Sequence, residues 1–237
     1  IVVASVSCIY GMGNPDDYQS GIIRLEKGMI LARNYFLHQL VESLYSRSET
    51  AMERGTFRVK GDTVDINLPY VDYAYRIVFF GDEIEKIEIL EKSSMKPIEA
   101  LDHAAIFPAN LYVAPKDRIH TIIREIEDEL HEQQLYFKSE GKLIESQRIQ
   151  ERTSFDLEMI KELGYCSGIE NYSRFFDRRE PGTRPFCLLD YFPDDYLLVI
   201  DESHVTIPQL RGMWGGDRAR KTNLVNFGFR LPSAMDN

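Results

Sequence analysis

The residues with the most specific chemical spacing are two acids and a histidine, Asp201, Glu202 and His204, directly after the apolar run Tyr196–Ile200. Such a run predicts a buried strand, and parallel α/β sheets bind ligands at the carboxyl ends of their strands. Adjacent acids there can divide the work of nucleotide hydrolysis. Asp201 would hold Mg²⁺ through a water, Glu202 would orient and deprotonate the attacking water, and His204 would link this site to another lobe. The alternative is a strand followed by an acidic loop.

A loop that could hold the nucleotide phosphates is absent from the sequence, because no GxxxxGK[ST] motif occurs in its 237 residues. The Gly11-Met12-Gly13 stretch does not replace it, since no lysine or helix-opening Ser or Thr follows. The chain starts without Met and stops abruptly at Met235-Asp236-Asn237, which favours a fragment of a longer protein. We therefore expect the chain alone not to hydrolyse ATP, and to bind no cofactor tightly.

Composition narrows the class of protein. Hydrophobic residues make up 43% and charged residues 28%, as in folded proteins, and the formal charge of −10 disfavours a diffuse basic coat for nucleic acid. A local basic patch is still possible. Three cysteines without a CxxC pair disfavour a disulfide framework or a cysteine zinc site and favour the cytoplasm. No apolar run approaches the roughly 20 residues of a membrane span.

The hydrophobic pattern predicts an α/β protein. Ile1–Ile9 and Tyr196–Ile200 are expected to be buried strands of a parallel sheet. Residues 28–44 are expected to form an amphipathic helix, with its apolar stripe at Ile30, Tyr35, Leu37, Leu40, Val41 and Leu44.

Between these segments the period changes twice. Residues 54–90 alternate between apolar and polar, with turns at Lys60–Asp62 and Gly81–Asp82, which predicts three or four antiparallel strands in a small α+β unit. Residues 115–163 return to helical spacing with a break at Ser139–Gly141. This predicts two long helices, with Gly164 as a C-cap.

Specific motifs run along the chain from end to end: VVASVSCIYG, RGTFRVKGD, FFGDEIEKI, GYCSGIENYSR, LLDYFPDDYLLVIDESHVTIPQLRGM, GDRARK and GFRLPSAMDN. Together these motifs resemble the UvrB family of bacterial nucleotide-excision repair. The transcription-repair coupling factor, the nearest alternative, shares a domain like residues 54–90 but lacks the later motifs. The resemblance implies a helicase-like DNA-repair subunit of an SOS-response excision nuclease.

The resemblance also implies a domain plan. Residues 1–28 and 183–237 would belong to the first RecA-like lobe, 29–114 would form the domain that binds UvrA, and 115–182 would form a helical domain near the DNA channel. The family's phosphate loop would lie before Ile1 and its second lobe after Asn237. The fold is thus a partial RecA-like lobe with an antiparallel α+β insertion and a helical insertion. ATP and Mg²⁺ would act in the full-length protein, with UvrA, UvrC and damaged DNA as partners.

For UvrA binding, Arg58 and Lys60 occupy the basic positions of the family's RGTFRVRGD motif, where Lys60 replaces a common arginine. Strand alternation from Phe57 and Val59 places both on the solvent face. Arg47 and Arg76 are weaker candidates by position. The alternative is an ordinary solvated strand face, on which lysine and arginine are common.

For DNA binding, the resemblance assigns aromatic residues that line the strand channel: Tyr10, Tyr112, Tyr165 and Phe229. Base stacking tolerates any sequence, which suits recognition of damage in any context. Arg211, Arg218, Arg220 and Lys221 add a local basic stretch. Core packing and a solvated helix face are the respective alternatives. Two function classes therefore stay open, an ATP-dependent repair subunit and a non-catalytic scaffold that joins UvrA and DNA.

Overall fold

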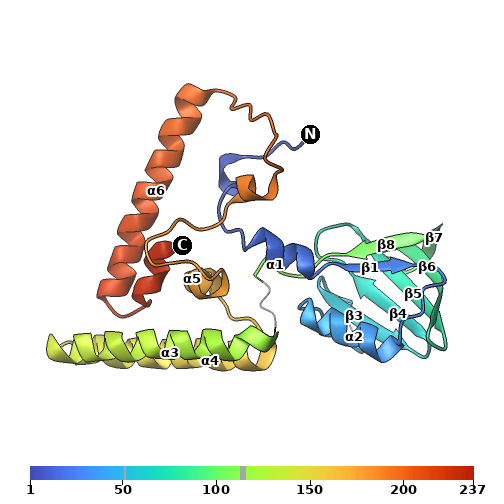
Figure 1. The fold of residues 1–237 in the computed structure, drawn as a ribbon, viewed down its shortest axis with the longest axis horizontal. Helices are drawn as coiled ribbons and strands as arrows, with labels where there is room; N and C mark the ends of the chain where they lie inside the picture. Colours follow the sequence, from blue (N-terminus) through green and yellow to red (C-terminus); the bar gives the residue numbers. More distant parts are fainter. Residues whose placement is uncertain (51, 113–115) are drawn as a thin grey trace. The chain divides into compact units, whose positions relative to one another are not determined.

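The computed structural model describes residues 1–50, 52–112 and 116–237. The chain divides into two compact units (Figure 1). The sheet unit comprises Asp16–Val113, and the helical unit comprises Ile1–Pro15 with Ala114–Asn237. Because the domain boundaries expected at residues 28, 114 and 182 follow from the resemblance, they stay predictions. Among the described residues, no helix combines the length and the apolar character needed to cross a membrane.

The sheet unit is built on six strands in the order β2-β3-β4-β5-β6-β7. Its elements are α1 (Pro15–Ser20), β1 (Ile23–Glu26), α2 (Arg33–Glu42), β2 (Ser46–Arg47), β3 (Thr56–Lys60), β4 (Thr63–Asn67), β5 (Tyr73–Phe80), β6 (Glu83–Glu91), β7 (Pro97–Leu101) and β8 (His103–Ile106). Strand β2 pairs parallel with β3, and every other neighbour pair is antiparallel. Strands β1 and β8 form a separate antiparallel pair.

Two short hairpins set the register of the central strands. Gly61 and Asp62 connect β3 to β4, and Gly81 and Asp82 connect β5 to β6. Both glycines have positive φ, +58° and +62°, which two-residue hairpin turns require. The antiparallel strands and both turns expected from the sequence are confirmed. One irregularity lies opposite Val78 and Phe79, where Glu85 is an extra residue in β6.

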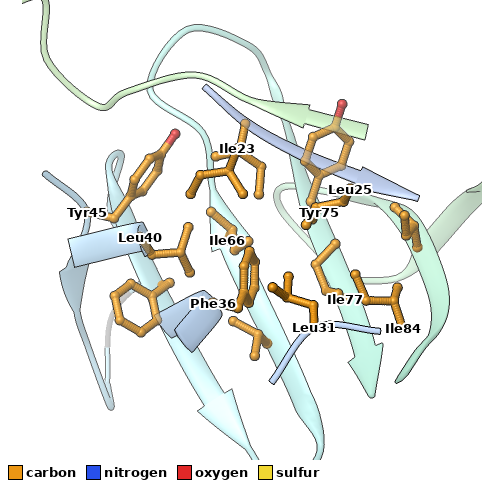
Figure 2. Packing of buried hydrophobic residues seen from close by; sticks show 14 of the residues in the cluster. Ile23, Leu25, Leu31, Phe36, Leu40, Tyr45, Ile66, Tyr75, Ile77 and Ile84 are labelled. Carbon is orange, nitrogen blue, oxygen red and sulfur yellow. The ribbon is translucent and has the colours of Figure 1, made fainter. Parts of the chain in front are cut away.

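The hydrophobic core of this unit lies between α2 and one face of the sheet. Figure 2 shows Phe36 and Leu40 of α2 gathered with Ile66 and Ile77 of the central strands. All four side chains are fully buried. Burial of each such side chain contributes about 1.5–3 kcal/mol, so this contact fixes α2 on the sheet.

The expected helix over residues 28–44 is corrected to α2, Arg33–Glu42. Gly28 takes a positive φ of +82°, and its backbone, with those of Met29 and Leu31, bonds to the β5–β6 hairpin. These backbone hydrogen bonds use N–H and C=O groups that a helix would need. The helix therefore begins only at Arg33, although the apolar residues before it have helical spacing. The expected apolar stripe is also wrong in part, because Tyr35 and Val41 are exposed whereas Phe36 is buried.

The helical unit contains the two expected long helices. They are α3 (Lys116–Ser139) and α4 (Leu143–Leu163), which pack against each other (Figure 1). Gly164 ends α4 with a φ of +71°, and its N–H donates to the carbonyl of Ile160 at 2.9 Å, so the expected C-cap is confirmed. The other elements are η1 (Val6–Cys8), η2 (Ile169–Tyr172), α5 (Ser173–Phe176), η3 (Leu188–Tyr191), α6 (Ser203–Asn226) and η4 (Pro232–Asp236).

The two strands expected at Ile1–Ile9 and Tyr196–Ile200 are wrong. The first contains the short 3₁₀ helix η1, and the second has no regular structure, with Leu197 and Val199 exposed. A buried strand needs neighbours to bond its backbone and cover its faces. Neither segment has a strand partner among the described residues. The coarser prediction, an α/β protein with an antiparallel unit and a helical unit, is confirmed.

Candidate functional site

A row of alternating charges crosses the sheet on the side opposite α2, which we call the polar face. Arg58 of β3 lies opposite Asp65 of β4, Asp65 opposite Arg76 of β5, and Arg76 opposite Glu88 of β6. The period of two that sends Phe57, Ile66 and Ile77 into the core places this row on the other face.

Asp65 lies beneath two arginines. Its Oδ1 accepts from Nε of Arg76 at 2.6 Å, and its Oδ2 accepts from Nη2 of Arg76 at 3.1 Å and from Nη2 of Arg58 at 3.0 Å. Asp65 is 3% exposed, whereas the arginine side chains are 17% and 24% exposed. Burial opposes ionisation, but the hydrogen bonds from Arg76 and Arg58 outweigh it and lower the pKa of Asp65.

Strand β6 carries a second buried acid, which has one cationic partner. Glu88 is buried, and its Oε1 lies 2.5 Å from Nζ of Lys86 of the same strand, whose side chain is half exposed. Lys86 belongs to the next row, in which Lys60 lies opposite Thr63, Thr63 opposite Val78, and Val78 opposite Lys86. The sequence analysis missed Lys86, although the alternation in EIEKIEI marks it as outward-facing.

An exposed aromatic residue lies at one end of the polar face. Phe80, the last residue of β5, is 77% exposed, whereas its neighbour Phe79 is buried in the core. Alternation along β5 places Phe80 on the same face as Arg76 and Val78. The sequence analysis also missed this residue, and the FFGD turn motif is the signal that could have identified it.

Of the four residues expected to bind UvrA, the structure brings Arg58 and Arg76 together, with Lys60 one row away. Arg47 lies elsewhere. It lines a shallow hollow of about 290 Å³ on the α2 side with Leu37, His38 and Phe57, and it pairs with Glu49 at 2.9 Å. The β2–β3 pairing causes this, because it places Arg47 opposite a core residue, Phe57.

The acid pair and histidine lie at the start of α6 and not at a strand end. Asp201 Oδ1 accepts from the N–H of Glu202 at 3.0 Å, and Glu202 Oε2 lies 3.3 Å from His204 Nδ1. All three side chains are exposed. No group of three or more acids, histidines or cysteines among the described residues could hold a metal ion. The three side chains do not form a buried site among the described residues, and their roles stay predictions.

The aromatic candidates for DNA binding differ in exposure. Tyr10, Tyr165 and Phe229 are partly exposed and belong to the helical unit, and Arg148 stacks over the Phe229 ring at 4.3 Å. Tyr112 belongs to the sheet unit and is 6% exposed, which leaves little ring surface for a base. These assignments also stay predictions.

The basic stretch of α6 is partly neutralised within the helix. Asp217 pairs with Arg220 and Lys221, both at 2.7 Å, and Lys221 is buried. Burial opposes ionisation of Asp217, but the bonds from Lys221 and Arg220 lower its pKa. Arg218 stacks over Trp214, and Arg211 is exposed. Only part of this stretch is available to a nucleic acid.

A network of charges joins the C-terminal GFRLPSAMDN motif to the helices. Arg174 of α5 lies 2.7 Å from Asp236 and 3.2 Å from Glu129 of α3. The Glu129 carboxylate also accepts from the N–H of Ser233 at 2.9 Å. Burial raises the pKa of Glu129, although Ser233 and Arg174 oppose the shift.

Comparison with known proteins identifies a large part of each unit. Residues 23–112 match the model of the UvrB interaction domain, and residues 117–178 match the model of the UvrB third helical domain. Over its full length the chain is 60% identical to UvrABC system protein B of Cytophaga hutchinsonii, 57% to that of Bacteroides fragilis and 52% to that of Chlorobaculum tepidum. The chain belongs to the UvrB family.

The chain spans 35% of the length of each of these UvrB relatives. The polar face lies wholly within the UvrB interaction domain, as does β1, which precedes the expected domain start at residue 29. Asp201, Glu202 and His204 lie outside both matched domains. The docking candidates and the nucleotide candidates therefore belong to different parts of this UvrB chain.

Proposed function

We propose that this chain is the part of a nucleotide-excision-repair subunit that docks on UvrA, and that the polar face is the docking surface. The observation that carries this proposal is the pair Arg58 and Arg76, fixed over the buried Asp65 within the UvrB interaction domain. In the whole protein this part would serve a cytoplasmic complex that uses ATP and Mg²⁺, examines damaged DNA and works with UvrC.

Charge supports an acidic partner. The chain carries a formal charge of −10, yet two acids of the polar face, Asp65 and Glu88, are buried beneath cations that reach solvent. The outer layer is therefore positive along the rows of Arg58, Arg76 and Lys86, whereas Glu83 is exposed opposite Phe80 at the end of the face. Arginine and aromatic residues are enriched among the residues that dominate binding energy, and Phe80 supplies the aromatic component.

The test compares two double variants of the 237-residue chain for binding to UvrA by biolayer interferometry. Arg58→Ala with Lys60→Ala removes two cations from the polar face, and we expect binding at least about tenfold weaker, or roughly 1.4 kcal/mol. Lys27→Ala with Lys96→Ala removes two exposed lysines from turns and serves as the control with equal charge change.

Three outcomes are distinguishable in that experiment. A loss confined to the Arg58 and Lys60 variant supports docking through the polar face. Equal losses in both variants would mean that only net charge matters, and unchanged binding in both would place the docking surface elsewhere. Circular dichroism of each variant shows whether the sheet unit is still folded.

A scaffold role is the second candidate function for the chain by itself. The exposure of Asp201, Glu202 and His204 favours it, because a nucleotide is oriented by groups that enclose it, and none of these three side chains is buried. DNA would be contacted through Tyr10, Tyr165 and Phe229, with Arg148 beside the Phe229 ring. Fluorescence anisotropy of single-stranded DNA tests this, and we expect Phe229→Ala to weaken binding more than Phe155→Ala, an exposed aromatic of α4.

A further inference from the structure

Two arginines of the polar face are already held in the free chain. Arg76 uses Nε and Nη2 to bond Asp65, and Arg58 uses Nη2. The Nη1 group of either guanidinium makes no hydrogen bond among the described residues. Each arginine therefore keeps Nη1 available, while two bonds to Asp65 fix the plane of Arg76 and one bond holds Arg58.

A fixed guanidinium is a better receptor for a carboxylate than a mobile one. Arginine recognises carboxylates through a planar fork, so the orientation of the plane decides whether two bonds can form. An exposed arginine would have to lose its rotamer freedom when the partner binds. An arginine anchored by a buried acid has lost that freedom before the partner arrives.

We propose that Asp65 is a positioning residue of the docking face. It holds Arg58 and Arg76 so that they can donate hydrogen bonds to carboxylates of an acidic protein surface. This inference rests on the proposed function. Glu88 supports the same row, since it lies opposite Arg76 and holds Lys86. Both acids are buried, so they anchor the cations without presenting negative charge to the partner.

Electrostatics alone gives the opposite expectation, which makes the inference testable. Replacing Asp65 with asparagine removes a negative charge and makes the face more positive. If only net charge mattered, an acidic partner would bind the variant more tightly. If Asp65 positions the arginines, the variant binds more weakly despite its additional positive charge.

The experiment is a double-mutant cycle in the 237-residue chain, with UvrA as the partner. We expect Asp65→Asn to weaken binding at least about fivefold. Arg58→Ala should also weaken binding at least about fivefold in the parent, but at most about twofold further in the Asp65→Asn background. Glu99→Gln removes one exposed acid of β7 and is the control with equal charge change; we expect it to bind like the parent or slightly more tightly.

Two further measurements keep the inference testable if Asp65→Asn folds poorly. Arg76→Lys keeps the positive charge but loses the two-point bond to Asp65, so we expect weaker binding from a chain of unchanged net charge. The Nε–H signal of Arg76 in the NMR spectrum of the free parent should exchange slowly with water, since Nε donates to Asp65 at 2.6 Å. In Asp65→Asn that protection should be lost.

The outcomes separate this inference from the docking proposal. If Arg58→Ala weakens binding while Asp65→Asn binds as tightly as the parent or more tightly, positioning by Asp65 is refuted and the docking face stands. If Arg58→Ala has no effect on UvrA binding, the docking face itself is wrong. Additive losses in the cycle would show that Asp65 and Arg58 act independently, which also contradicts positioning.

Discussion

Arg76 and Asp65 face each other across strands β5 and β4 and form a two-point bond, with Nε–Oδ1 at 2.6 Å and Nη2–Oδ2 at 3.1 Å. A buried carboxylate is tolerated only when its charge is compensated and its oxygens are bonded. Arg76 meets both conditions, and Arg58 adds a third bond. This relationship connects the stability of the sheet unit to its proposed docking surface.

The first prediction concerns pH. The pKa of Asp65 is lower in the folded chain than its unfolded value of about 3.9, so its ionised form stabilises the fold. That contribution is fully present above about pH 3.9 and is lost as pH falls through the lower folded pKa. Urea unfolding between pH 7 and pH 2 should show a loss of stability in acid that is smaller in Asp65→Asn. Equal losses in both proteins would contradict this role.

Asp65→Asn should also lower the free energy of unfolding at pH 7. Removing one member of a buried ion pair costs about 3–5 kcal/mol, and asparagine keeps one acceptor oxygen, so we expect the lower end of that range. Asp72→Asn is the matched control, because Asp72 pairs with Arg54 at 3.1 Å on the surface. That change should cost at most about 1 kcal/mol.

The second prediction concerns Phe80. Its ring is exposed at the end of the polar face, two positions along β5 from Val78, which lies opposite Lys86, and aromatic residues are enriched at interface centres. We expect Phe80→Ala to weaken UvrA binding about fivefold to tenfold, or roughly 1–1.4 kcal/mol, without changing the thermal stability. Tyr35→Ala, an exposed aromatic of α2 on the other side of the sheet, should bind like the parent. A similar loss in both variants would argue against a specific role for Phe80.

Local patterns were sufficient for the parts of the fold that depend on neighbours in sequence. The hairpins at Gly61 and Gly81 and the C-cap at Gly164 each need only a glycine at a positive φ between regular segments. Segments that need a distant partner were not predictable. Strand β1 pairs with β8, so that Ile23 lies opposite Ile106, far along the sequence, and no local pattern identifies that pairing.

The polar face was likewise predictable only where the prediction depended on neighbours in sequence. Alternation along β3 was enough to place Arg58 and Lys60 on one face. Asp65 could not be assigned a role, because its importance depends on the register of β4 between β3 and β5. Tyr196–Ile200 has the composition of a buried strand, but composition cannot supply the neighbouring strands that would bury it.

The third prediction concerns ATP. Because Asp201 and Glu202 are exposed and the sequence has no GxxxxGK[ST] motif, we expect the 237-residue chain to show no ATP turnover of its own. Glu202→Gln is the matched control, since any residual activity that it leaves unchanged comes from a contaminant. Magnesium-dependent turnover that persists on repeated purification and falls in Glu202→Gln would contradict the prediction. In the whole protein, the same variant tests the role that the sequence assigns to Glu202.

The fourth prediction concerns the C-terminal motif and its contact with α4. Gly228 has a φ of +69°, and a Cβ added there would lie 2.5 Å from the carbonyl oxygen of Glu145. Alanine would therefore meet both a strained backbone conformation and a backbone clash, which cost about 1–2 kcal/mol and about 1–3 kcal/mol respectively. We expect Gly228→Ala to increase hydrogen exchange in residues 228–237 and in α4.

Gly182→Ala separates the two costs. Gly182 also has a positive φ, +79°, but an added Cβ would meet no atom within 4 Å. This variant should show only the backbone cost of about 1–2 kcal/mol, with α4 exchanging as in the parent. If both variants raise exchange in α4 equally, the contact between Gly228 and Glu145 does not hold the C-terminal motif on the helix. If only Gly228→Ala raises exchange in α4, the close approach of the Gly228 backbone to Glu145 is what holds the C-terminal motif on α4.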